Sequence, residues 1–154
     1  SPERAGMEQQ RGQPWSISGR YNHYRFDMNR DLIGTTQQEV RNIVGGMLRW
    51  HPMVTADLHG YTVQYYMAPA SRPINANISG WPNKWGEAIG AGNARAFDEF
   101  GWLYYVRDQF DLYYPGYYDS WPALNGAMGA TYETDGGPAL LKRRDDGLYG
   151  WHQS

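Results

Sequence analysis

Apolar residues recur with a helical period in the first half of the chain. They stand three and four residues apart and therefore share one face of a helix: Val40, Ile43, Val44, Met47 and Leu48. The preceding Thr36-Gln37-Gln38-Glu39 has the Thr-x-x-Glu form of a capping box, in which both side chains bind unpaired amides at a helix start. Pro52 ends the pattern, so the sequence predicts a helix between Thr36 and Pro52.

Two adjacent glycines, Gly45 and Gly46, lie inside this predicted helix. Each glycine weakens a helix by about 1 kcal/mol relative to alanine. We expect close packing of the helix on a sheet to compensate for this loss.

A short apolar run follows the helix directly. Residues Met53 to Leu58 include the β-branched pair Val54-Thr55, and the run predicts a buried strand. His59 then lies at the carboxyl end of that strand. In open α/β sheets this is the edge at which ligands bind, because the loops that leave the strand ends form the crevice.

The second half of the chain repeats the alternation of helix and strand. A helix is predicted from about Pro82 to Phe100, with Gly101 as its C-terminal stop. Strands are predicted at residues 102–106 and at residues 127–133, and the second of these ends at Glu133. Helices that alternate with buried strands favour an α/β fold.

The first 20 residues are polar and lack periodicity, which predicts a loop or a frayed end. No internal repeat or low-complexity linker divides the rest, so residues 21–154 are predicted to belong to a single domain. The chain begins at Ser1 and its first methionine is Met7, so we expect another segment to precede it.

Charge and composition exclude several classes of function. The net charge is −2 and the basic residues are scattered, so we expect no binding of nucleic acid or of an anionic membrane. No apolar run approaches the ~20 residues that a membrane span needs. The chain has no cysteine, which excludes disulfides and a Cys-ligated metal but fits both a reduced cytoplasm and an extracytoplasmic compartment.

The chain is rich in aromatic residues and glycine, with 7 Trp, 13 Tyr, 4 Phe and 19 Gly. This combination is typical of functional loops that bring amphipathic rings to a surface. A large core with tyrosines at its edge explains the same composition.

Three residues near predicted element ends have chemistry suited to an active site. Arg30, beside Asn29, has a planar guanidinium that matches a carboxylate with two parallel hydrogen bonds. His59 can bind a metal, and Glu133 can act as a base toward a water molecule. Each also has an ordinary explanation: a surface ion pair for Arg30, a structural hydrogen bond for His59 and a solvated carboxylate for Glu133.

Taken together, these segments resemble a known enzyme family. They are Asp27-Met28-Asn29-Arg30-Asp31, Asp57-Leu58-His59-Gly60-Tyr61 and Ala130-Thr131-Tyr132-Glu133, within a longer similarity over residues 20–140. The order and the contexts resemble the second half of an M14 zinc carboxypeptidase of the bacterial type. The resemblance implies a carboxypeptidase-like α/β fold, with a mixed, largely parallel sheet and helices on both faces.

The resemblance also implies roles for these residues. Asn29 and Arg30 would bind the free C-terminal carboxylate of a peptide, His59 would be the third ligand of a Zn²⁺ ion, and Glu133 would be the catalytic base. The family's first two zinc ligands come from an upstream His-x-x-Glu motif, which this sequence lacks. We therefore expect an incomplete domain that depends on a missing N-terminal part and is inactive alone. The family favours a secreted or periplasmic location.

The resemblance leaves two further roles incompletely assigned, and the place of Asp57 two residues before His59 on one strand face leaves its role open as well. The family's mobile substrate-binding tyrosine falls among Tyr113, Tyr114, Tyr117 and Tyr118, of which we favour Tyr114 and then Tyr117, with Gly116 as the hinge. The oxyanion-stabilising arginine has no recognisable counterpart among Arg11, Arg20 and Arg25. Asp57 fits either a group that supports His59 or a structural hydrogen-bond acceptor.

Two alternatives to a carboxypeptidase remain open at this point. An M14-like amidohydrolase would use the same residues to deacylate N-acyl amino acids. A non-catalytic peptide- or glycan-binding module would use the aromatic surface and need no metal.

Overall fold

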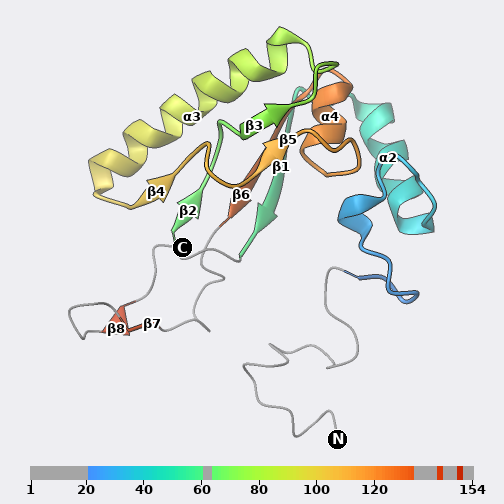
Figure 1. Ribbon diagram of the computed structural model, residues 1–154, viewed down its shortest axis with the longest axis horizontal. Helices are drawn as coiled ribbons and strands as arrows, with labels where there is room; N and C mark the ends of the chain where they lie inside the picture. The colour runs from blue at the N-terminus through green and yellow to red at the C-terminus, as the bar shows by residue number, and fades with distance from the viewer. Residues whose placement is uncertain (1–20, 61–63, 134–141, 144–148, 151–154) are drawn as a thin grey trace, which may run out of the picture.

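The computed structural model describes residues 21–60, 64–133, 142–143 and 149–150. In these ranges the chain has a mixed α/β fold built on a four-stranded, mostly parallel sheet (Figure 1). The strand order is β1 (Val54–His59), β6 (Met128–Glu133), β2 (Tyr65–Tyr66) and β4 (Tyr104–Tyr105). The β1–β6 and β2–β4 pairs are parallel and the β2–β6 pair is antiparallel. The predicted fold class is confirmed.

The pairing of β1 with β6 brings two distant parts of the sequence into register. Six residue pairs run from Val54 opposite Met128 to His59 opposite Glu133. Because the strands are parallel, both carboxyl ends point the same way. His59 and Glu133 are therefore neighbours at the carboxyl ends of the two strands.

Helix α3 (Gly80–Phe100) covers one face of the sheet (Figure 1). Met128 and Ala130 of β6 form a buried cluster on this face with Ala68, and Ile89 of α3 packs against it. At Gly90 an added Cβ would lie 2.8 Å from the Ala68 carbonyl carbon. Glycine therefore allows the close approach of α3 to the chain that follows β2.

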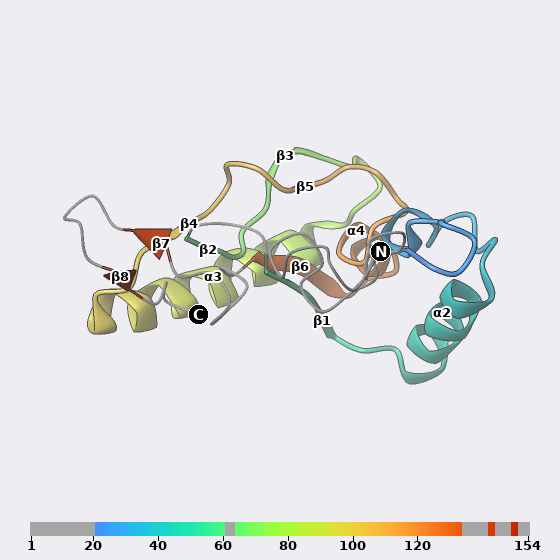
Figure 2. The same cartoon turned by 90° about the horizontal axis from the view of Figure 1, so that it is seen from below.

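The opposite face of β6 is approached by the short helix α4 (Ser120–Leu124), whose preceding residue Asp119 contacts Gly129 and Thr131. A two-stranded parallel ribbon of β3 (Ser71–Ile74) and β5 (Asp111–Leu112) lies to one side of the main sheet (Figure 2). A small core joins this ribbon to α4 and contains Ile78, Leu112 and Ala123.

The remaining elements lie outside the main sheet. Helix α2 (Gln38–Trp50) packs through its buried Val40 and Val44 against Leu32 and Trp121. The 3-10 turn η2 (Met28–Arg30) precedes it. Strands β7 (Lys142–Arg143) and β8 (Tyr149–Gly150) form an antiparallel pair. No helix in the described ranges has the length and apolar character that a membrane crossing requires.

The predicted helices are confirmed, but the capping box at Thr36 is wrong. Helix α2 begins at Gln38, and its N-cap Gln37 makes no side-chain capping bond. The Thr36 hydroxyl donates instead to Asp31 Oδ1 at 2.8 Å, and the Gln37 amide donates to Asp31 Oδ2 at 2.8 Å. Partial burial opposes ionisation of Asp31, but these hydrogen bonds outweigh it and lower the pKa of the carboxyl.

Two further packing expectations are corrected. Cβ atoms added at Gly45 or Gly46 would meet no described atom within 4 Å, so these glycines do not serve close packing on a sheet. Strand β1 is also not buried, since Val54 is 50% exposed and Leu58 is 75% exposed. The reason is its place at the edge of the sheet, where α3 covers the neighbouring β6 but leaves β1 open.

Candidate functional site

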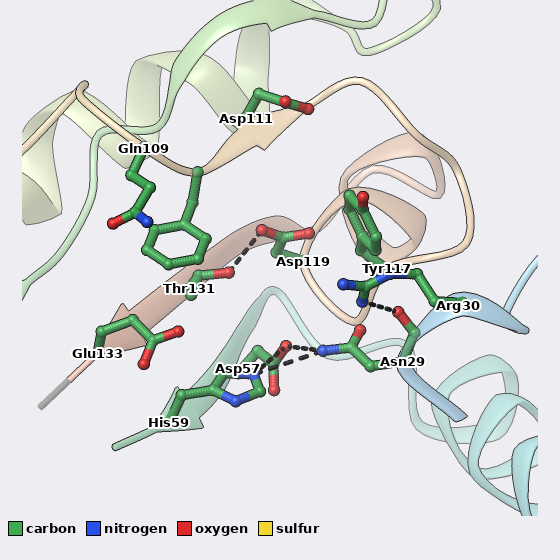
Figure 3. Close-up of a pocket in the computed structure, with 11 residues that line it drawn as sticks. Asn29, Arg30, Asp57, His59, Gln109, Asp111, Tyr117, Asp119, Thr131 and Glu133 are labelled. Carbon is green, nitrogen blue, oxygen red and sulfur yellow. Dashed lines mark hydrogen bonds and ion pairs between the residues drawn. The ribbon is translucent and has the colours of Figure 1, made fainter. Parts of the chain in front are cut away.

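A small cavity of about 160 Å³ lies at the carboxyl ends of β1 and β6 (Figure 3). Its walls come from η2, both strand ends, β5 and the loop before α4. The lining residues are Asn29, Arg30, Asp57, His59, Gln109, Phe110, Asp111, Tyr117, Asp119, Thr131 and Glu133. Five of the six residues predicted to form the site therefore surround one cavity, and the sixth, Tyr114, does not line it.

The turn η2 fixes the position of Asn29. The Asn29 backbone N–H donates to the Asp27 carboxylate at 3.0 Å, and this bond caps the turn. Its side-chain oxygen accepts a hydrogen bond from the Tyr118 backbone at 2.8 Å, and its Nδ2 donates to Asp57 Oδ2 at 2.8 Å. Asn29 thus joins the turn to strand β1 and to the tyrosine-rich loop.

His59 is held by the same carboxylate oxygen. Its Nε2 lies 2.9 Å from Asp57 Oδ2, and Asn29 Nδ2 lies 3.4 Å from His59 Nε2. A carboxylate only accepts, so Nε2 carries the donated proton and the lone pair of a neutral ring is on Nδ1. The sequence left two roles open for Asp57, and the geometry connects it directly to His59.

Arg30 stands at the mouth of the cavity with its side chain 46% exposed. Its Nη1 donates to the Asn29 carbonyl at 2.6 Å, and its Cζ lies 4.4 Å from the centre of the Tyr117 ring. The ion pair with Asp27 is long, at 3.9 Å. Stacking on an aromatic face orients a guanidinium while leaving its edge available for a planar anion.

The tyrosine-rich loop, residues 113–118, binds the backbone of η2. The Tyr114 hydroxyl donates to the Arg30 carbonyl at 2.8 Å, and the Tyr114 and Tyr117 rings pack edge to face with centres 5.0 Å apart. A Cβ on Gly116 would lie 2.5 Å from the Arg30 carbonyl oxygen, so close approach explains this glycine. Burial, followed by nearby carboxylates led by Asp57, raises the pKa of Tyr118.

Asp119 and Thr131 form a part of the wall that the sequence analysis missed. Asp119 is 4% exposed and accepts hydrogen bonds from the Thr131 hydroxyl at 2.6 Å and from the Ser120 amide at 2.6 Å. Burial raises the pKa of Asp119 in spite of these bonds. The signal available in the sequence was Asp119 directly before Ser120-Trp121-Pro122, because aspartate is a preferred helix N-cap.

Glu133 ends β6 on the cavity side and is 4% exposed. Asp57, Asp111 and Asp119 bring further carboxyl groups, whereas Arg30 and His59 are the basic residues in the wall. The cavity therefore combines one guanidinium at its mouth with several carboxyl groups inside.

The described residues are not arranged as a complete metal site. Within the described ranges, no three or more His, Cys, Asp or Glu side chains are placed to hold one metal ion. His59 suits the part of a single zinc ligand, but a catalytic zinc needs three protein ligands. Of the arginines weighed for the oxyanion, Arg25 does not line the cavity, and Arg11 and Arg20 lie outside the described residues.

No protein-family model, curated protein or solved structure matched this chain. The case for a function therefore rests on the chemistry of the cavity and on the sequence segments that surround it.

Proposed function

We propose that this chain carries the substrate-binding and proton-transfer part of a zinc metallocarboxypeptidase. The observation that carries the proposal is the cavity itself, which has Arg30 at its mouth and the in-register pair His59 and Glu133 at its strand-end wall. This combination brings a carboxylate-binding group and a candidate base to opposite sides of a space of about 160 Å³.

Arg30 binds the substrate's free carboxylate in this proposal. Its guanidinium lies against the Tyr117 ring and is half exposed, so a peptide end can reach it from solvent. Bidentate binding by arginine fixes the orientation of a carboxylate as well as its position. One amide bond is then presented to the strand-end wall, which restricts hydrolysis to chain ends.

Glu133 acts as the general base in this proposal. It takes a proton from the attacking water and passes it to the nitrogen of the leaving amine. The position of Glu133 opposite His59 supports this role, because both side chains arise from strand ends that lie next to each other.

Zn²⁺ is the cofactor of the proposed enzyme, with His59 as one ligand. When bound, the ion would supply Lewis-acid chemistry at the substrate carbonyl. The remaining ligands must come from outside the described residues, since these residues do not form a complete site. As part of this proposal, a further protein segment is the partner that supplies these ligands.

The Arg30→Lys variant tests the assignment without requiring turnover. Calorimetric titration with an acylated tripeptide bearing a free C-terminus should show at least tenfold weaker binding, because a point charge cannot reproduce the bidentate fork. The amidated tripeptide should bind both proteins equally weakly. Arg49→Lys, on the exposed last turn of α2, is the matched control. Equal losses for the free and amidated peptides would contradict the role of Arg30.

The small cavity also favours a second candidate, the hydrolysis of N-acyl amino acids. A volume of about 160 Å³ suits a single amino-acid residue with its carboxylate. Mass spectrometry of the products separates the two activities, because a carboxypeptidase shortens peptides while a deacylase releases a free amino acid from a simple acyl group. A binding module would instead be supported if peptides still bind after the metal is chelated and are not hydrolysed either with or without metal.

A further inference from the structure

We propose that Asp57 is a positioning residue that links the carboxylate-binding end of the cavity to His59. One oxygen of its carboxylate holds both the Asn29 amide and the His59 imidazole (Figure 3). The proposal rests on the proposed function for its catalytic meaning, but its geometry can be tested independently.

Asp57 is placed for this role by the strand that carries it. Side chains alternate along β1, so Asp57 and His59 share the cavity side while Leu58 faces away. The Asp57 side chain is 13% exposed, so its hydrogen bonds are shielded from water. Hydrogen bonds to a charged acceptor are roughly twice as strong as neutral ones.

The two bonds converge from different elements of the fold. Asn29 reaches Asp57 Oδ2 from η2 at 2.8 Å, and His59 reaches the same oxygen from the end of β1 at 2.9 Å. Asn29 is also the residue adjacent to Arg30, whose guanidinium donates to the Asn29 carbonyl. Arg30 and His59 are therefore connected through only two residues, Asn29 and Asp57.

Nuclear magnetic resonance of the full chain tests this link without any metal or activity. An imidazole N–H proton is observed only when a hydrogen bond slows its exchange with water. We expect a His59 Nε2–H signal in the unmodified protein and its loss in Asp57→Ala. The Asn29 side-chain amide signals should move in the same variant. In Asp57→Asn, which keeps an oxygen acceptor without the charge, the Nε2–H signal should persist at a shifted position.

Asp111→Asn is the matched control, because Asp111 lines the same cavity but its carboxylate accepts from the Tyr113 amide. It should leave the His59 and Asn29 signals unchanged. The proposal is overturned if Asp57→Ala keeps the Nε2–H signal, or if only one of the two partners responds. If Asp57→Ala fails to fold, an unchanged spectrum in Asp57→Asn overturns it equally.

The result for Asp57 can be distinguished from the result for the proposed function. Loss of the signals with no peptide binding at Arg30 would keep Asp57 as the link and refute the hydrolase. Peptide binding at Arg30 with unchanged signals would support the hydrolase and refute the link through Asp57.

Discussion

Replacing Gly129 by alanine is expected to be among the most damaging small changes in this protein. Gly129 lies in β6, and an added Cβ would overlap the Asp119 carbonyl oxygen and stand 2.8 Å from its carbonyl carbon. These are backbone atoms at the start of α4 and cannot rotate aside. Relief requires β6 and α4 to separate, which also stretches the 2.6 Å hydrogen bond from Thr131 to Asp119.

The magnitude follows from these two effects. Overpacking in a filled interior costs about 1–3 kcal/mol. Leaving a buried acceptor without its donor costs about 1–3 kcal/mol more. The free energy of unfolding should therefore fall by roughly 2–6 kcal/mol, a large part of the 5–15 kcal/mol typical of a domain.

Urea denaturation followed by tryptophan fluorescence measures this loss, with Gly45→Ala as the control. Gly45 lies in α2 with open space around its Cα, so the same substitution should raise the free energy of unfolding by about 1 kcal/mol. A loss below about 1 kcal/mol for Gly129→Ala would refute the close approach of β6 to Asp119. An equal loss in both variants would refute the packing argument as a whole.

Three further predictions concern Glu133, Asp31 at the start of α2, and the metal. Glu133→Gln should reduce hydrolysis by several orders of magnitude in a zinc-loaded active form while titrated peptide binding persists, and retained turnover would assign the base elsewhere. Asp31→Asn should cost about 0.5–1 kcal/mol at neutral pH. Because the pKa of Asp31 is lowered on folding, its contribution is present above 3.8, and the difference between the proteins in urea denaturation should shrink as the pH falls below that value. The chain alone should retain no stoichiometric zinc after dialysis and should not cleave peptides, and metal analysis showing one tightly held ion would reveal ligands that our assignment lacks.

Long, strongly patterned elements were predictable from the sequence. The spacing of Val40 and Val44 identified α2, and Gly101 marked the end of α3, where it adopts the left-handed conformation with φ of 66°. Strands β1 and β6 were also placed within about one residue of their bounds. The strand predicted at residues 102–106 is observed as β4 at Tyr104–Tyr105. Strands β2, β3 and β5 were missed, because such short pieces are defined by distant partners and carry no period of their own.

The cavity was predictable to a different extent. The sequence pointed to Arg30, His59 and Glu133, which line one cavity. The parallel register of β1 and β6 places His59 beside Glu133, and the bonds of Asn29 to Asp57 and Tyr118 hold η2 at the same place. It did not reveal Asp119, whose partner Thr131 lies 12 residues away. Likewise, the hydrogen bond from the Gln37 amide to Asp31 was missed because a turn returns this carboxylate to a residue six positions later. The helix-start position of Asp119 was readable from the sequence, but its contact with Thr131 and the contact of Asp31 with Gln37 depend on chain reversals that local patterns do not specify.

The attachment of η2 explains why the Arg30 side chain can be tested separately from its surroundings. The turn is held by the Tyr118 amide to Asn29 Oδ1, by the Tyr114 hydroxyl to the Arg30 carbonyl and by the Leu32 amide to the Gly116 carbonyl. None of these bonds uses the guanidinium. A lysine at position 30 therefore changes the shape and spread of the positive charge and removes the guanidinium's bond to the Asn29 carbonyl, while these three bonds to the turn remain. A selective loss of free-carboxylate binding would then report the recognition chemistry of this side chain, since a displaced turn would weaken the free and amidated peptides together.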